Sequence, residues 1–151
     1  MTGQPLTPQQ IADHVRTGML ANDRATQSLG MRIAAMGPGS ATLEMAVRAD
    51  MLNGHGTCHG GFITALADSA FAFACNAGNE LTVASGLSID FLAPAREGDV
   101  LTARAHEVSQ AGRTGVYDAS VHNQRGELVA IFRGRSHRMK GRPAVPVDPP
   151  R

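Results

Sequence analysis

The sequence has little of what marks several common classes of protein. Its 151 residues include no tryptophan, one tyrosine and two cysteines, and the formal net charge is only +1. Scarce aromatic residues leave few platforms for stacking nucleic-acid bases, and a near-neutral chain lacks the basic surface of a nucleic-acid or membrane binder. Two cysteines are too few for a disulfide framework. We therefore expect no nucleic acid or membrane as a partner, reduced thiols and a cytoplasmic protein.

Long hydrophobic runs are also missing. The longest apolar stretch, residues 62–75, is interrupted by Asp68 and is shorter than the roughly 20 residues that span a bilayer. The N-terminal residues are polar and lack the apolar core of a secretory signal. Apolar residues still make up 42% of the chain, so one domain with a sizeable core is expected.

The hydrophobic pattern changes from helical to strand-like along the chain. Apolar residues at helical spacing predict a helix over residues 7–21, and residues 60–77 are apolar around so much of their circumference that they predict a buried helix. Alternating apolar residues predict six strands, over residues 29–36, 41–48, 81–91, 100–108, 114–123 and 128–138. Short turns between the last strands favour an antiparallel sheet that curves around the buried helix, an α+β fold.

Three segments are expected from these patterns. Residues 1–24 form an N-terminal helical segment, residues 25–140 form the main domain, and residues 141–151 form a flexible tail. The tail contains four of the eight prolines of the chain, and proline-rich ends are commonly without fixed structure.

The densest polar cluster, residues 53–61 (NGHGTCHGG), directly precedes the buried helix. Free backbone N–H groups at a helix start favour a negative oxygen, and Gly60 and Gly61 have no side chain to keep a substrate away. The cluster is therefore either an oxyanion-type site or a glycine-rich capping turn.

Asp68 lies inside the same predicted helix, among alanines and leucine. A buried, unpaired carboxylate is costly, so such a residue has either a basic partner or a catalytic task. Eight residues at 1.5 Å each separate Gly60 from Asp68 by about 12 Å. One carbonyl cannot touch both. If both serve one reaction, one of them comes from another copy of the chain, which predicts a homodimer with sites at its interface.

Two other polar groups are weaker candidates. His55, Cys58 and His59 match no usual zinc spacing, so we expect no metal. Near the end of the domain the chain is basic and lacks carboxylates. This basic cluster, which includes Arg133, Arg135 and Arg138, either binds substrate phosphates or is a solvated strand end.

The polar cluster and Asp68 together resemble the hotdog-fold acyl-CoA thioesterases, in particular the phenylacetic-acid-degradation group. Further segments add to the resemblance, which covers roughly residues 29–140: ADSAFA at 67–72, IDFL at 89–92, TGVYD at 114–118 and FRG at 132–134. It implies a curved antiparallel sheet wrapped around one long helix, and dimers that often pair into tetramers.

The resemblance also implies residue roles. Asp68 would attack the thioester or activate water, the Gly60 N–H would polarise the carbonyl, and Asn53 and His59 would orient the carbonyl or the water. Gly61 and Ser69 are expected to contact the substrate near the reacting group, and the candidates for the coenzyme A phosphates are Arg133, Arg135 and Arg138. No cofactor is implied, because coenzyme A is part of the substrate.

The leading prediction is hydrolysis of phenylacetyl-CoA, or of a ring-hydroxylated aryl relative, to the free acid and coenzyme A during aromatic catabolism. A hydratase on the same fold would pair a histidine with a carboxylate at the reacting carbon, whereas His59 has the character of an orienting residue. The alternative from another class is a non-catalytic acyl-CoA-binding regulatory module, which would not need Asp68.

Overall fold

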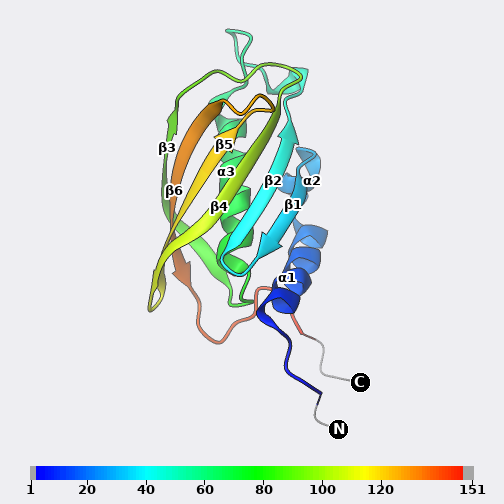
Figure 1. The fold of residues 1–151 in the computed structure, drawn as a ribbon, viewed down its shortest axis with the longest axis vertical. Coiled ribbons are helices and arrows are strands. Elements are labelled where there is room, and N and C mark those ends of the chain that lie inside the picture. The colour runs from blue at the N-terminus through cyan, green and yellow to red at the C-terminus, as the bar shows by residue number, and fades with distance from the viewer. Residues whose placement is uncertain (1–2, 148–151) are drawn as a thin grey trace.

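The structure, a computed structural model, describes residues 3–147. A six-stranded antiparallel sheet curves around one long helix, α3 (Gly60–Asn76) (Figure 1). Two helices, α1 (Pro8–Asn22) and α2 (Arg24–Ser28), come before the sheet, and a 3-10 turn, Ala49–Met51, follows its second strand. The spatial order is β1-β2-β4-β5-β6-β3, with bounds Arg32–Gly37, Ser40–Ala46, Val100–Ala111, Thr114–His122, Leu128–Arg138 and Thr82–Phe91.

Helix α3 fills the concave side of the sheet, as its apolar circumference predicts. Leu66, Phe71 and Phe73 are at most 1% exposed, and the Phe71 ring packs 5.5 Å from Tyr117 and 5.8 Å from Phe132, between ring centroids. Gly134 on β6 makes this packing possible, because a Cβ there would lie 2.8 Å from the Phe71 ring. None of the helices within residues 3–147 is long and apolar enough to cross a membrane.

The helix and the two strands predicted in the N-terminal half are present, with shifted boundaries. Alternating residues of β2 are buried, and α1 begins after a capping box formed by Thr7 and Gln10. The first strand begins at Arg32 and not at residue 29, because residues 24–28 form α2. The Asp23 side chain caps this short helix by accepting from the Thr26 N–H (2.9 Å).

The two edges of the sheet differ. On β1, side chains of α1 occupy the outer carbonyls: Gln9 donates to the Met36 carbonyl (2.8 Å) and Arg16 to the Ile33 carbonyl. On β3, no strand or helix within the described part of the chain pairs with the outer edge. Leu87 and Phe91 on β3 are 39% and 51% exposed. Strand β3 is therefore an open edge with apolar side chains, which is a template for another chain.

Strand β3 departs from the predicted alternation at one point. The pattern places Val83 on the face of Leu87 and Phe91, but the pairing with β6 skips Ser85. An extra residue of this kind turns the preceding side chains to the opposite face. Val83 consequently pairs with the exposed His137, and Leu87 with the buried Gly134.

After β6 the chain runs back across the end of the molecule to α1 (Figure 1). The Met139 N–H donates to the Leu81 carbonyl and the Leu81 N–H to the Arg142 carbonyl, each at 2.8 Å. Residues 141–147, expected to be flexible from their prolines, thus have defined contacts in the fold. Residues 148–151 lie outside the described residues.

Candidate active site

The loop before α3 is organised by the Asn53 side chain. Its Oδ1 accepts from the backbone N–H of His55 (2.9 Å) and of Thr57 (3.2 Å), and its Nδ2 donates to the Thr57 hydroxyl (3.0 Å). The Cys58 N–H anchors the loop to the Ala95 carbonyl (2.8 Å) after β3. Asn53 therefore holds the loop closed, as Asx turns do, and brings Gly60 to a fixed place.

His59 caps α3 through its ring. The Nδ1 atom accepts from the Gly61 N–H (2.9 Å), so in this geometry the ring is neutral and carries its proton on Nε2. The Gly61 N–H is thereby used within the protein. The Gly60 N–H has no hydrogen-bond partner among residues 3–147. Of the two predicted backbone donors, only Gly60 is free for a substrate oxygen.

Gly60 borders a cavity of about 440 Å³ that Asn53 and the segment 91–95 also line. The Phe91 ring lies against Gly60 so closely that a Cβ would be 2.8 Å from its Cζ. We call Asn53, His59 and Gly60 the Gly60 half-site. It combines a free backbone donor, a helix N-terminus and a fixed loop, which suits a carbonyl oxygen that gains negative charge.

Asp68 lies in a second cavity, of about 320 Å³, between α3 and the beginning of β3. Its carboxylate is half-buried and has no hydrogen bond or ion pair within the described residues. Burial without compensation raises the pKa of Asp68 above its ordinary value of 3.8. Of the two explanations for this residue, a basic partner within the described part of the chain is excluded. We call Asp68 and its cavity the Asp68 half-site.

The structure separates the two half-sites within one chain. Gly60 and Asp68 line different cavities, the first beside the end of β3 and the second beside its beginning. Their separation of about two helical turns matches the distance argued from the sequence. Both cavities adjoin the open edge strand.

Ser69 is placed on another face of α3. Its hydroxyl lies 3.2 Å from the Thr26 hydroxyl, which itself donates to the Asp23 carboxylate (2.7 Å). Because Thr26 has a single proton and the carboxylate can only accept, Ser69 is the donor to Thr26. In this structure Ser69 joins α2 to α3.

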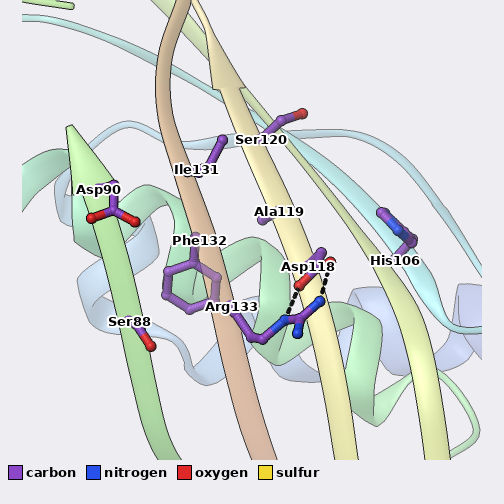
Figure 2. Close-up of a pocket in the computed structure, with 9 residues that line it drawn as sticks. All are labelled: Ser88, Asp90, His106, Asp118, Ala119, Ser120, Ile131, Phe132 and Arg133. Carbon is purple, nitrogen blue, oxygen red and sulfur yellow. Dashed lines mark hydrogen bonds and ion pairs between the residues drawn. The ribbon is translucent and has the colours of Figure 1, made fainter. Parts of the chain in front are cut away.

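The three predicted arginines lie outside both cavities. Arg133 forms a two-point ion pair with Asp118, at 2.7 and 2.8 Å, on the sheet face opposite α3 (Figure 2). This ion pair lowers the pKa of Asp118. Arg135 lies against Gly86, and Arg138 is 3.3 Å from Glu80 at the end of β6. Arg133 and Arg135 are two residues apart and share the exposed face of β6, away from α3, whereas Arg138 lies on the other face at the end of the strand.

Several residues of the two cavities were not predicted. Met19 of α1 and Ala144 of the C-terminal segment line the Asp68 cavity, although they lie far from Asp68 in sequence. No local pattern signals such a contact, because it depends on how the ends of the chain pack. Within residues 3–147, no three or more His, Cys, Asp or Glu side chains are grouped to hold a metal ion.

Comparison with known proteins identifies the family. The Thioesterase superfamily matches residues 55–130, from the loop before α3 to β6. The chain belongs to this superfamily. It is 50% identical to the Escherichia coli K12 acyl-coenzyme A thioesterase PaaI over 123 residues, which cover 82% of this chain and 88% of that protein. The expected family is confirmed.

Solved structures confirm the expected hotdog fold. The structure of E. coli PaaI, from the phenylacetic acid degradation operon, superposes with a TM-score of 0.88 at 46% identity, covering 90% of this chain and 99% of that one. A Streptococcus mutans UA159 protein bound to acetyl CoA superposes with a TM-score of 0.71 at 25% identity, covering 74% of this chain and 90% of that one.

Proposed function

We propose that this protein is an acyl-CoA thioesterase that hydrolyses phenylacetyl-CoA, or a ring-hydroxylated relative, to the free acid and coenzyme A. The observation that carries the proposal is Asp68: a half-buried carboxylate without a partner among residues 3–147, on an apolar cavity. The 50% identity to an acyl-coenzyme A thioesterase supports the reaction, and the origin of PaaI in a phenylacetic acid degradation operon supports the acyl group.

The proposed chemistry uses one group from each half-site. The Gly60 N–H, at the start of α3, donates to the thioester carbonyl oxygen and stabilises the negative charge that forms on it. The Asp68 carboxylate attacks the carbonyl carbon, or it takes a proton from a water that attacks. In either route the C–S bond breaks and coenzyme A leaves as a thiolate. The first route forms an anhydride that water then hydrolyses.

This chemistry needs two copies of the chain. When two β3 edges pair antiparallel about a two-fold axis, the beginning of one strand meets the end of the other. Residues 82–84 border the Asp68 cavity, and residues 91–93 border the Gly60 cavity. Such a dimer brings Asp68 to Gly60 of the partner subunit. The open, apolar edge of β3 supports this arrangement.

We further propose that two dimers associate through the outer face of the sheet. Arg104, Ser120, Ile131 and Asp90 form one row across β4, β5, β6 and β3. Neither Arg104 nor Asp90 has an ion-pair partner in the part of the chain that the structure covers. A two-fold axis at the centre of the row places each arginine opposite an aspartate, so the row is complementary to itself.

We propose the cytoplasm as the location, and the state of the two cysteines supports it. Cys58 and Cys75 are free and buried, and burial raises the pKa of both thiols, that of Cys75 to about 12. Protonated, buried thiols are suited to a reducing compartment, which supports the cytoplasm as the location.

The test is release of free thiol from phenylacetyl-CoA and from a medium-chain aliphatic acyl-CoA, by the wild type and by Asp68→Asn. Faster hydrolysis of the aryl substrate, lost by about 10²–10⁴-fold in the variant, is expected from a missing base or nucleophile. Hydrolysis that is equal in both proteins would contradict the role of Asp68. A folded wild type that binds both thioesters and hydrolyses neither would favour the regulatory acyl-CoA-binding module instead.

A further inference from the structure

Segments near both ends of the chain contribute to the lining of the Asp68 cavity. Its lining combines Phe71 and Ala72 of α3, Leu81 before β3, Met19 of α1 and Ala144 of the C-terminal segment. Apart from Asp68 and a few small polar groups, the wall is apolar. Its volume of about 320 Å³ is at the small end of the range for ligand pockets. A cavity of this kind suits a compact acyl group.

Residues 141–147, which we call the C-terminal strap, are anchored next to this wall. The Val145 N–H donates to Asn79 Oδ1 (2.8 Å), and Asn79 Nδ2 donates to the Val145 carbonyl (3.0 Å). Asn79 has a φ of 61°, a left-handed conformation that asparagine tolerates better than most residues. The strap thus has a specific two-point attachment to the turn after α3.

A second anchor holds the strap to α1. The Val145 side chain lies over Gly18, and a Cβ at Gly18 would overlap both of its methyl groups. Glycine inside a helix is less favourable than alanine, and here the close approach of Val145 accounts for its presence. Met19 follows Gly18 and Ala144 precedes Val145 in the sequence, and both Met19 and Ala144 line the Asp68 cavity.

We propose that the C-terminal strap and α1 form the distal wall of the acyl pocket, and that Met19 and Ala144 limit the size of the acyl group. The inference rests on the proposed thioesterase function and adds a selection rule to it. Arylacetyl and short acyl groups fit between Asp68 and the strap, whereas long acyl chains meet the strap. Moving the strap should lengthen the accepted chain, and filling the cavity should shorten it.

Two variants test the wall in opposite directions. Gly18→Ala displaces Val145 while improving the helix propensity of α1, and Ala144→Leu fills the cavity. The readout is kcat/KM for acetyl-CoA, phenylacetyl-CoA and decanoyl-CoA. Thr17→Ala is the matched control, because Thr17 is an exposed neighbour on α1 that bonds only the Asp13 carbonyl in the described fold.

We expect Ala144→Leu to lower the ratio of phenylacetyl-CoA to acetyl-CoA turnover by about tenfold or more, a typical effect of lost pocket volume. Gly18→Ala should raise the ratio of decanoyl-CoA to phenylacetyl-CoA turnover severalfold, and Thr17→Ala should change neither ratio. If Ala144→Leu does not fold, judged by circular dichroism, Met19→Ala replaces it and should shift the ratios as Gly18→Ala does.

The strap proposal alone would be overturned if the variants fold, keep a thioesterase activity that Asp68→Asn abolishes, and show the same substrate ratios as the wild type. A folded wild type that hydrolyses none of the three thioesters would overturn the proposed function, and the strap proposal with it. The two failures are therefore distinguishable in one set of assays.

Discussion

The two half-sites hold their polar groups in opposite ways. In the Gly60 half-site, Asn53 closes its loop with three hydrogen bonds and His59 accepts from Gly61, which leaves the Gly60 N–H as the free donor. In the Asp68 half-site, the carboxylate has no partner in the described structure and lies among apolar side chains.

This difference suits two different tasks. A donor that stabilises developing charge works best when it is fixed before the reaction, and the bonded loop provides that rigidity. A carboxylate that attacks or takes a proton gains basicity when it is poorly solvated, and burial without a partner provides that. In the proposed mechanism, the Gly60 half-site supplies a fixed donor and the Asp68 half-site supplies the reactive group.

Among variants that keep Asp68, disrupting the Gly60 half-site should have the largest effect. In Gly60→Ala the new Cβ would lie 2.8 Å from the Phe91 ring, so either the ring or the start of α3 must shift. We expect kcat to fall by about 10²-fold, as when one oxyanion donor is displaced. Steady-state hydrolysis of phenylacetyl-CoA measures this. Gly54→Ala is the control, because a Cβ there meets nothing within 4 Å. Equal losses in both variants would contradict a special role for Gly60.

The Asp68 half-site should determine how the activity depends on pH. Because burial raises the pKa of Asp68, its active, ionised form disappears at a higher pH than for an ordinary aspartate of 3.8. We expect kcat to fall about tenfold per pH unit below that raised pKa. The residual activity of Asp68→Asn should lack this acid limb. An acid limb with its midpoint at or below pH 3.8 would show that Asp68 is not the titrating group.

The same shift affects stability in a defined direction. The folded state favours protonated Asp68, so this contribution to stability is greatest below pH 3.8 and is lost as the pH rises through the raised pKa. The ionised Asp68 carboxylate therefore lowers the free energy of unfolding at neutral pH, whereas the hydrogen bonds around Gly60 raise it.

Substitutions of His59 should distinguish its capping of α3 from a role in catalysis. Their expected effect on stability is small. The His59 Nδ1 caps α3, so His59→Ala should lower the free energy of unfolding by about 1 kcal/mol, and His59→Asn, which can also cap, should restore most of it. Chemical denaturation measures the stability, and thiol release measures the activity. Activity that recovers fully in His59→Asn would mean that the ring Nε2 has no part in catalysis.

Local sequence patterns predicted the structural elements that surround Gly60. The apolar circumference of α3, the alternation in β2 and the polar cluster before Gly60 all depend on neighbours in sequence, and the structure has the expected elements there. The use of the Gly61 N–H by His59 was not predicted, because it depends on a side-chain rotamer.

The Asp68 half-site was less predictable because its walls come from remote segments. Met19 and Ala144 reach it only through the packing of the two chain ends, and the skipped Ser85 in β3 breaks an alternation that looked regular. The arginines could have been placed better. Phe132 and Gly134 are the inward positions of β6, so the alternation already assigns Arg133 and Arg135 to the outer face.

In the proposed dimer, each site combines Asp68 of one subunit with Gly60 of the other. Mixing the inactive variants Asp68→Asn and Gly60→Ala, with subunit exchange by mild denaturation and refolding, tests it directly. Random pairing makes half of the dimers mixed, and each mixed dimer regains one intact site, so about a quarter of wild-type activity should return. Each variant refolded alone is the control. Recovery no greater than the sum of these controls, with exchange shown by mass spectrometry, would contradict the shared site.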